Sequence, residues 1–296
     1  MQKIWKKVPA LVVFLAIIGG IFAMSPVSYA DRAEQEMPSN DETVKELSYV
    51  EKEITVYIND SEMMSRGRLI EDTTYMPLRA MCEELDDCEI AWNDGIATVN
   101  SDTVKIIVQQ GSNYIAANDR ILYHDKMIRN LDGRIYVPIR SLAKAYSLTV
   151  EWDDLNKSVR LYGDPKGLKH GSEFYNSNDL YWLSRIIQAE SGGEPLRGKI
   201  AVGNVVINRM NRPDYPNTIK DVIFDRKFGT QFTPVASGTI YNTPSYESIL
   251  AAKICLDGYS LNNEMIFFLN PKIATNFWIT NYRTYVMTIG NHKFYK

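Results

Sequence analysis

The sequence predicts an α+β protein built from two domains of different kinds. Short alternating strands separated by Asp, Asn and Gly turns run from residue 50 to residue 163, and part of this pattern occurs twice. Helical spacing of apolar residues dominates residues 173–296, where a short β-hairpin pattern ends the sequence. We therefore expect a separate α+β repeat domain over residues 50–163, followed by a mainly helical domain with a small β-hairpin region over residues 173–296.

The first 30 residues have the pattern of a secretory signal peptide. Met1–Lys7 carries three lysines, Val8–Met24 is almost entirely apolar, and Ser28 and Ala30 supply small residues at positions −3 and −1 of a cleavage site. An uncleaved membrane anchor is the alternative, because an apolar segment of 17 residues is near the lower limit for spanning a bilayer. In both cases we expect the rest of the protein to lie outside the cytoplasmic membrane.

Residues 31–49 are polar and charged and predict a flexible tether, whereas residues 164–172 have the Pro and Gly content of a linker. The net charge of −3 over 296 residues is unevenly distributed. Residues 31–172 carry 17 basic and 26 acidic residues, and residues 173–296 carry 13 basic and 10 acidic residues. The small positive excess suits an anionic partner such as a cell wall, with chance as a competing explanation, and no nucleic-acid partner is expected.

The cysteines and histidines give no basis for metal chemistry. Their spacing fits neither a structural zinc site nor a disulfide-rich scaffold, so we expect no metal and no cofactor. A disulfide between Cys82 and Cys88 is left open, whereas Cys255 lies in an apolar run and is expected to be a buried core residue. The complete set is Cys82, Cys88, Cys255, His124, His170 and His292.

An internal repeat organises residues 50–163. The segment Thr74–Met81 returns as Ile135–Leu142 with an offset of 61 residues, and Ile90–Asp94 returns as Val150–Asp154 with an offset of 60. Each copy has the order strand, Tyr-x-Pro-x-Arg, short helix, strand, turn, strand. The proline of each copy fits the first turn of the helix, where a missing N–H group costs nothing.

The Tyr-x-Pro-x-Arg segment and the Trp that follows it in each copy resemble the N-terminal (stalk) domain of copper amine oxidases, which is common in exported bacterial wall proteins. The resemblance covers about residues 53–162 and implies a contact with the cell wall or with a protein. It does not imply copper, because one imidazole, that of His124, does not make a copper site. For Trp92 and Trp152 we weigh sugar stacking against packing and favour packing. The same caution applies to Arg79 and Arg140, for which a structural role is favoured over a functional one.

Two helices are predicted on either side of residues 191–195. Asn178 or Asp179 can cap a helix that runs to about Glu190. Pro195 then takes a first-turn position before a second helix over Arg197–Met210. In the second helix, Gly198 and Gly203 are small enough for another helix to approach closely.

Further along, Ser245 is expected to cap a helix that ends near Asp257, with Gly258 after it. A hairpin is predicted across Gly290-Asn291, and His292 is expected to fix this turn rather than to act as a base.

Glu190 is the candidate catalytic residue. It lies at the carboxyl end of an apolar helix, where the helix dipole and the apolar neighbours both raise the pKa of a carboxyl group. A carboxylic acid that stays protonated near neutral pH can protonate the leaving oxygen during cleavage of a glycosidic bond. Taken alone, the same pattern also fits a solvated Glu near a helix end.

Six ordered blocks in the second domain resemble the SleB-like cell wall hydrolase family of the spore cortex-lytic type. The resemblance implies a lysozyme-like domain that cleaves the β-1,4 bond between N-acetylmuramic acid and N-acetylglucosamine in peptidoglycan, often as a lytic transglycosylase. It also implies that Glu190, in an Ala-Glu-x-x-Gly-Glu-Pro motif, is the catalytic residue of that family. The blocks are Arg185–Pro195, Gly198–Arg209, Tyr215–Ile223, Gln231–Val235, Phe267–Pro271 and Ile289–Phe294.

A transglycosylase needs only one acid/base residue, because the C6 hydroxyl of the substrate is the nucleophile. A hydrolase could use a second carboxylate, for which several candidates stay open, although Glu194 is expected to cap the second helix instead. The candidates are Glu194, Asp214, Asp221, Asp225 and Glu247.

Six residues are candidates for substrate binding. The Glu190-Ser191 pair resembles that of the soluble lytic transglycosylases, in which the Ser helps to orient the Glu. Amide groups can bind the N-acetyl and hydroxyl groups of sugars, and aromatic faces can stack on the rings, although Phe232 and Trp278 also fit a core position. The six are Ser191, Gln231, Phe232, Tyr241, Asn270 and Trp278.

The main functional hypothesis is an exported enzyme that acts on the glycan strands of peptidoglycan. The alternative is a wall-binding protein that retains the fold without turnover. The choice between hydrolysis and transglycosylation, between vegetative wall and spore cortex, and the oligomeric state are left open at this point.

Overall fold

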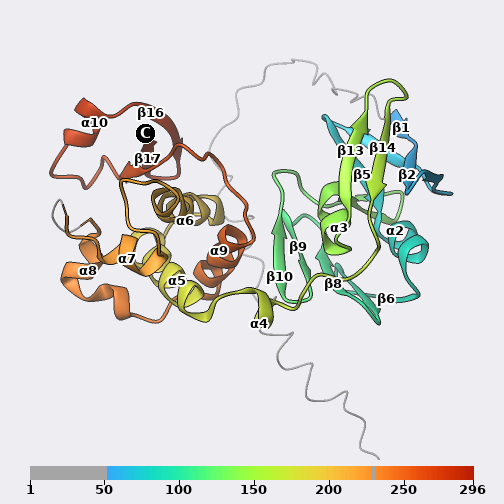
Figure 1. Cartoon of the computed structure of the whole chain (residues 1–296), viewed down its shortest axis with the longest axis horizontal. Coiled ribbons are helices and arrows are strands. Elements are labelled where there is room, and N and C mark those ends of the chain that lie inside the picture. Colours follow the sequence, from blue (N-terminus) through green and yellow to red (C-terminus); the bar gives the residue numbers. More distant parts are fainter. Residues whose placement is uncertain (1–51, 228–230) are drawn as a thin grey trace, which may run out of the picture. The chain divides into compact units, whose positions relative to one another are not determined.

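The computed structural model describes residues 52–227 and 231–296 (Figure 1). The predicted signal peptide (1–30) and tether (31–49) lie outside the described residues. In the ranges that are described, no helix is long and apolar enough to cross a membrane. The α+β prediction is confirmed, because strands dominate up to Tyr162 and helices dominate from Gly171 onward.

Three sheets make up the repeat domain, and all of their neighbouring strands are antiparallel except β14 and β2. The first sheet has the order β1 (Lys52–Ile54), β4 (Gly67–Ile70), β5 (Thr73–Pro77), β12 (Arg134–Pro138), β11 (Arg129–Leu131). The second has the order β10 (Arg120–Tyr123), β9 (Tyr114–Ala117), β8 (Lys105–Gln109), β7 (Ile96–Ser101), β6 (Cys88–Asn93). The third has the order β13 (Thr149–Asp153), β14 (Ser158–Tyr162), β2 (Val56–Ile58), β3 (Ser61–Glu62).

The predicted repeat is present as the succession β5, α2 (Leu78–Leu85), β6 and β7, which returns as β12, α3 (Ile139–Ala145), β13 and β14. Pro77 and Pro138 are the N-cap residues of α2 and α3, one position before the predicted first turn. Each proline is also the last residue of a strand. Because proline has no backbone N–H group to donate to a neighbouring strand, the strand ends there and the helix begins at the next residue.

The two copies meet along β5 and β12. In this antiparallel pair Tyr75 lies opposite Pro138, Met76 opposite Val137, and Pro77 opposite Tyr136. Because Tyr75 is equivalent to Tyr136, and Pro77 to Pro138, the pairing is self-complementary. An approximate two-fold axis therefore passes through the Met76–Val137 pair, as it would in a symmetric dimer. Both of these side chains are fully buried in the core of the domain.

The C-terminal domain is mainly helical, with one small sheet. The sheet has the order β15 (Phe267–Leu269), β17 (His292–Tyr295), β16 (Tyr285–Ile289), and β16 and β17 form the predicted hairpin. The helices are α4 (Gly171–Phe174), α5 (Ser177–Ser191), α6 (Leu196–Met210), α7 (Ile219–Phe224), α8 (Thr233–Ser237), η1 (Thr239–Tyr241), α9 (Tyr246–Leu256) and α10 (Trp278–Tyr282).

Side-chain caps mark the start of four of these helices, α4, α5, α7 and α9. Asn176, not Asn178 or Asp179, caps α5, because its side chain accepts hydrogen bonds from the backbone N–H groups of those two residues. Ser245 caps α9 as predicted, and Gly258 follows that helix with φ of +90°, a conformation that favours glycine.

Helices α5, α6 and α9 pack together in the centre of the C-terminal domain. Gly203 on α6 lies where these helices come closest. A β-carbon built on it would be 2.7 Å from Sγ of Cys255 on α9 and 2.9 Å from Cδ1 of Ile187 on α5. The prediction that Gly203 allows close helix approach is therefore confirmed, and Cys255 is the buried core residue that was expected.

Candidate functional site

The site is built around Glu190 in the last turn of α5. The preceding part of this helix buries Leu183, Ile186 and Ile187 in the core, so that the position of Glu190 is determined by the packing of the helix. After Ser191 the chain turns, and α6 begins at Leu196. Glu190 therefore lies where two buried helices are joined, and its side chain is only partly exposed to solvent.

Glu190 has the electrostatic properties expected of a general acid. Burial raises the pKa of its carboxyl group from an ordinary value of 4.5 to about 7, and the positive charge of Arg209 opposes this shift. The carboxyl end of α5 adds a further contribution that disfavours negative charge. A carboxyl group with a pKa near 7 can donate a proton at neutral pH and can take one back afterwards.

Arg209 is a buried cation in the last turn of α6. It is 5% exposed, and its Nε donates a hydrogen bond of 2.7 Å to the carbonyl oxygen of Ile266. Its guanidinium lies over three aromatic rings, with distances to the ring centroids of 5.1 Å for Phe232, 5.5 Å for Tyr215 and 5.6 Å for Phe267. Burial lowers the pKa of Arg209. Interactions with Tyr215, Asp225 and Glu190 oppose this shift but are smaller than the effect of burial.

The ring of Phe267 connects Arg209 to the exposed end of the site. Trp278 meets it edge to face with ring centroids 5.6 Å apart, and Arg283 lies over both rings. Trp278 itself is 39% exposed. Two of the predicted residues, Glu190 and Trp278, are thus linked through Arg209 and Phe267, two residues that were not predicted as site residues.

Ser191 does not have the geometry expected for orienting Glu190. It is 2% exposed, and its hydroxyl donates a hydrogen bond of 2.7 Å to the carbonyl oxygen of Ile187 one turn earlier. The hydroxyl proton is therefore used within α5. A serine in a helix commonly makes this bond, because its side chain can reach the carbonyl four residues back.

Phe232 lies in the core rather than on an open surface. It is 2% exposed, and its ring packs against Phe268 and under Arg209. Its ring is therefore enclosed by protein on the faces that a sugar would need. Of the two roles considered for Phe232, the structure supports the core position.

The other predicted substrate-binding residues lie on separate elements. Tyr241 on η1 is 61% exposed and contacts Trp182 of α5 with ring centroids 6.1 Å apart. Asn270, at the end of β15, is half-buried, and its Oδ1 accepts a hydrogen bond from the backbone N–H of Lys272. Gln231 is half-buried at the start of the segment that leads into α8.

Glu194 does not cap α6, contrary to the expectation. Pro195 is the N-cap residue, and no side chain caps this end of the helix. The Glu194 carboxylate instead accepts two hydrogen bonds of 2.9 Å from the backbone and side chain of Asn291, and Nδ1 of His292 is 3.8 Å away. Burial would raise the pKa of Glu194, but the bonds from Asn291 and the charges of His292 and Lys199 lower it overall.

This contact gives Glu194 and His292 structural roles, because it holds the β16–β17 turn against the start of α6. Three of the remaining acidic candidates have partners in the protein. Asp221 accepts a hydrogen bond from Thr218, Asp225 accepts one from the backbone of Lys227, and Glu247 pairs with the buried Lys199 at 2.5 Å. Asp214 is exposed.

The structure contains no group of three or more His, Cys, Asp or Glu side chains that could hold a metal ion within the residues that it describes. The cysteines are all present as free thiols, so Cys82 and Cys88 are not joined here.

Comparisons with known proteins define the class of both domains. Residues 193–295 match the family described as Cell Wall Hydrolase, and residues 57–161 match the Copper amine oxidase N-terminal domain. The chain therefore carries a cell wall hydrolase domain preceded by a copper amine oxidase N-terminal domain, and both resemblances found in the sequence are confirmed. The first match begins three residues after Glu190.

Individual relatives share the C-terminal domain. The spore cortex-lytic enzyme of Bacillus cereus is 35% identical over 122 residues, which are 41% of this chain and 46% of that protein. The spore cortex-lytic enzyme of Bacillus subtilis is 34% identical over 120 residues, 40% of this chain and 38% of that protein. The chain thus spans less than half the length of these curated relatives.

A solved structure covers the same region. The catalytic domain of the germination-specific lytic transglycosylase SleB from Bacillus anthracis is 34% identical and superposes with a TM-score of 0.38. The match covers 44% of this chain and the whole of that chain.

Proposed function

We propose that this protein cleaves the glycan backbone of peptidoglycan at the β-1,4 bond between N-acetylmuramic acid and N-acetylglucosamine, with Glu190 as the general acid and base. The single observation that carries the proposal is the burial of Glu190, which raises its pKa to about 7. The membership of the domain in the Cell Wall Hydrolase family supports the choice of substrate.

In the first step, the protonated Glu190 carboxyl donates its proton to the bridging oxygen as the bond from that oxygen to C1 of N-acetylmuramic acid breaks. The positive charge that develops at C1 can be stabilised by the N-acetyl group of the same sugar. In the second step, the Glu190 carboxylate accepts a proton from the group that attacks C1. Attack by the C6 hydroxyl of the sugar gives a 1,6-anhydro end, and attack by water gives a reducing end.

Arg209 supports both steps through its charge. It opposes the effect of burial on the Glu190 pKa, and it stabilises the carboxylate that forms once the proton has left. Without a nearby cation, a buried carboxyl group would hold its proton more tightly and donate it less readily. We therefore assign Arg209 as a positioning residue that adjusts the acidity of Glu190.

We propose that the exposed aromatic faces of Tyr241 and Trp278 and the amide groups of Gln231 and Asn270 contribute to binding of the glycan strand. Amides match the N-acetyl and hydroxyl groups of the substrate, and the aromatic side chains present faces on which sugar rings can stack. The site of action would be the cell wall or the spore cortex outside the cytoplasmic membrane.

The test is digestion of purified peptidoglycan, from vegetative walls and from spore cortex, by the full chain and by Glu190→Gln. The amide keeps the size of the side chain but has no proton to transfer, so we expect a loss of activity of at least 100-fold, in the range known for a general acid. Mass spectrometry of the released fragments then identifies 1,6-anhydro or reducing ends.

A matched control is Glu264→Gln, because Glu264 is an exposed glutamate of the same domain that pairs with Lys296. This variant should keep full activity. Equal release of fragments by the Glu190→Gln variant and the parent would rule out the role of Glu190. Binding to peptidoglycan without release of fragments by the parent would instead support the wall-binding alternative.

A further inference from the structure

Two grooves share a set of lining positions in the repeat domain, and the first is also bordered by Asp257, Gly258 and Tyr259 of the C-terminal domain. The first, with a volume of about 830 Å³, is lined by Pro138, Arg140, Val150 and Trp152, and the second, of about 660 Å³, by Pro77, Arg79, Ile90 and Trp92. These two sets are the same positions of the two sequence copies. Each of these four residues of one groove corresponds to one of the other at the offset of 61 or 60 residues found in the sequence.

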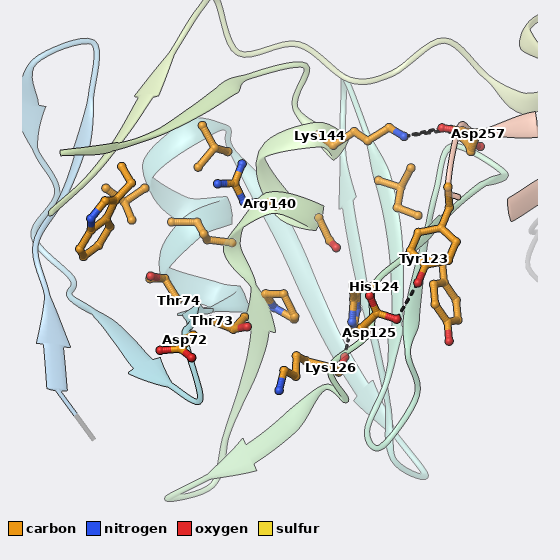
Figure 2. Close-up of a pocket in the computed structure, with 18 of the residues that line it drawn as sticks. Asp72, Thr73, Thr74, Tyr123, His124, Asp125, Lys126, Arg140, Lys144 and Asp257 are labelled. Atoms are coloured by element: carbon orange, nitrogen blue, oxygen red, sulfur yellow. Dashed lines mark hydrogen bonds and ion pairs between the residues drawn. The ribbon is translucent and has the colours of Figure 1, made fainter. Parts of the chain in front are cut away.

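Each groove also uses the opposite copy. Asp72–Thr74 of the first copy lines the first groove, and the equivalent Gly133–Ile135 of the second copy lines the second groove. Figure 2 shows the first groove, with Arg140 and Lys144 on one side of it and Asp72, Thr73 and Thr74 on the other. The two grooves are therefore related by the approximate two-fold axis at the Met76–Val137 pair.

The tryptophans of both grooves are exposed, Trp92 to 52% and Trp152 to 39%. Packing in the core, the interpretation favoured from the sequence, therefore accounts for neither of them. An exposed tryptophan presents a large apolar surface to water, and two at equivalent positions indicate a surface that is built for contact. Trp152 is also oriented by the hydrogen bond of 3.0 Å from its Nε1 to Asp154.

The polar side chains near each tryptophan suit a carbohydrate. Arg79 and Arg140 are exposed and offer several planar N–H donors, and Arg79 forms a solvent-exposed pair with Glu83 at 3.3 Å. Hydroxyl groups of Thr73 and Thr74 line the first groove, and the carboxylates of Glu83 and Glu84 line the second. An aromatic face flanked by donors and acceptors matches the two sides of a sugar ring, one apolar and one rich in hydroxyl groups.

The charge of the domain narrows the class of ligand. Residues 52–162 carry 13 basic and 18 acidic residues, so the domain repels a polyanion such as a phosphate polymer. The N-acetylglucosamine units of a β-1,4-linked glycan carry no charge, so contact with them has no such penalty. The repeating units of such a glycan also match a surface that presents the same recognition element twice.

We infer that the repeat domain binds β-1,4-linked N-acetylated glycan at two equivalent sites, with Trp92 and Trp152 as the stacking residues. This inference rests on the proposed function for the choice of glycan. Two sites on one domain would keep the protein on an insoluble glycan while the C-terminal domain acts, since a linked second contact strengthens the first.

The test uses the full chain carrying Glu190→Gln, so that the ligand is not degraded, with Trp92→Ala, Trp152→Ala and both together. The probes are a chitin hexasaccharide in calorimetric titrations and purified peptidoglycan in sedimentation assays. We expect each single variant to bind the hexasaccharide more weakly at one of the two sites, and the double variant to bind it more weakly at both. Retention on peptidoglycan should fall by roughly 2- to 10-fold per tryptophan, as stacking energies of about 0.5–1.5 kcal/mol imply.

The control is Leu155→Ala, because Leu155 is 94% exposed and belongs to neither groove. Trp92→Tyr and Trp152→Tyr keep a stacking face and should retain most of the binding, whereas thermal unfolding verifies that each variant folds. A double variant that binds the hexasaccharide as tightly as the parent would overturn the inference. The inference would also be overturned if the tryptophan variants weakened binding to the peptides attached to peptidoglycan and did not weaken binding to glycan without peptides.

The two proposals can fail separately. Cleavage of short soluble glycan fragments by chains that retain Glu190 measures the catalytic proposal and should not respond to the tryptophan variants. If the parent cleaves these fragments but glycan binding is independent of both tryptophans, only the present inference fails. If binding depends on the tryptophans and no chain cleaves glycan, only the proposed function fails.

Discussion

At the scale of single residues, Glu190 is held between two opposing influences. Burial raises its pKa and the charge of Arg209 lowers it, with a result of about 7. The sequence predicted the upward shift, because an apolar helix that ends in a Glu implies burial near the helix terminus. It could not predict the contribution of Arg209, which lies 19 positions away on another helix.

The alkaline side of the pH–rate profile follows from this balance. Only the protonated form of Glu190 can act as the acid, so kcat/KM on solubilised peptidoglycan should decrease as the pH rises through about 7, by about tenfold per pH unit above it. Initial rates of fragment release between pH 5 and pH 9 measure this. A rate that still rises between pH 7 and pH 9 would contradict the assignment.

Substitution of Arg209 should move this profile. Arg209→Met removes the charge that lowers the Glu190 pKa, so the decrease in kcat/KM should shift to higher pH. Arg209→Lys keeps a positive charge and should leave the decrease closer to its original position. An unchanged profile in the Met variant, with the fold verified by circular dichroism, would show that Arg209 does not act on Glu190.

At the scale of secondary structure elements, patterns within one segment predicted helices well and contacts between segments poorly. The cap at Ser245 and the close approach at Gly203 follow from local sequence. The role of Glu194 does not, because a Glu before a Pro at a helix start is typical of a cap. Here its carboxylate binds Asn291, which is 97 positions later in the sequence, and hairpin packing overrides the local preference.

Gly203 provides the test at this scale. Gly203→Ala would place a β-carbon 2.7 Å from Sγ of Cys255 and 2.9 Å from Cδ1 of Ile187, so these side chains or the helices that carry them would have to shift. We expect a loss of about 1–3 kcal/mol in the free energy of unfolding, measured by urea denaturation. Gly193→Ala, where a β-carbon meets no atom within 4 Å, is the control. Equal stability of the two variants would contradict the packing described for α6.

At the scale of the whole molecule, the repeat is the feature whose meaning changed most. The sequence showed two copies, but only the pairing of β5 with β12 relates them by a two-fold axis and builds each groove from both copies. Each copy has one tryptophan, Trp92 or Trp152, and the spacing of residues in the sequence does not indicate that these side chains face solvent. Whether these side chains are exposed depends on how the three sheets pack against one another, which is a property of the folded domain.

The cysteines report on folding across both domains. Burial raises the pKa of Cys82 to about 12 and also raises the pKa of Cys255, so neither thiol should react with iodoacetamide at pH 8 in the folded protein. Cys88 is half-buried and should react slowly. Mass spectrometry should show all three labelled after denaturation. Rapid labelling of Cys82 or Cys255 in the native state, or a change in Tm on addition of a reducing agent, would contradict this.

The sequence was sufficient for the two domain types, the internal repeat, the approximate bounds of α5, α6 and α9, and the prediction of Glu190 as the candidate acid, because each of these depends on residues that are close together along the chain. Only the folded chain shows that Phe232 belongs to the core, that Glu194 holds a hairpin, and that the charge of Arg209 opposes the rise in the pKa of Glu190. It also shows that the two tryptophans face solvent. The physical reason is that burial and charge contacts depend on which distant segments meet, and periodicity within one segment carries no information about its partner.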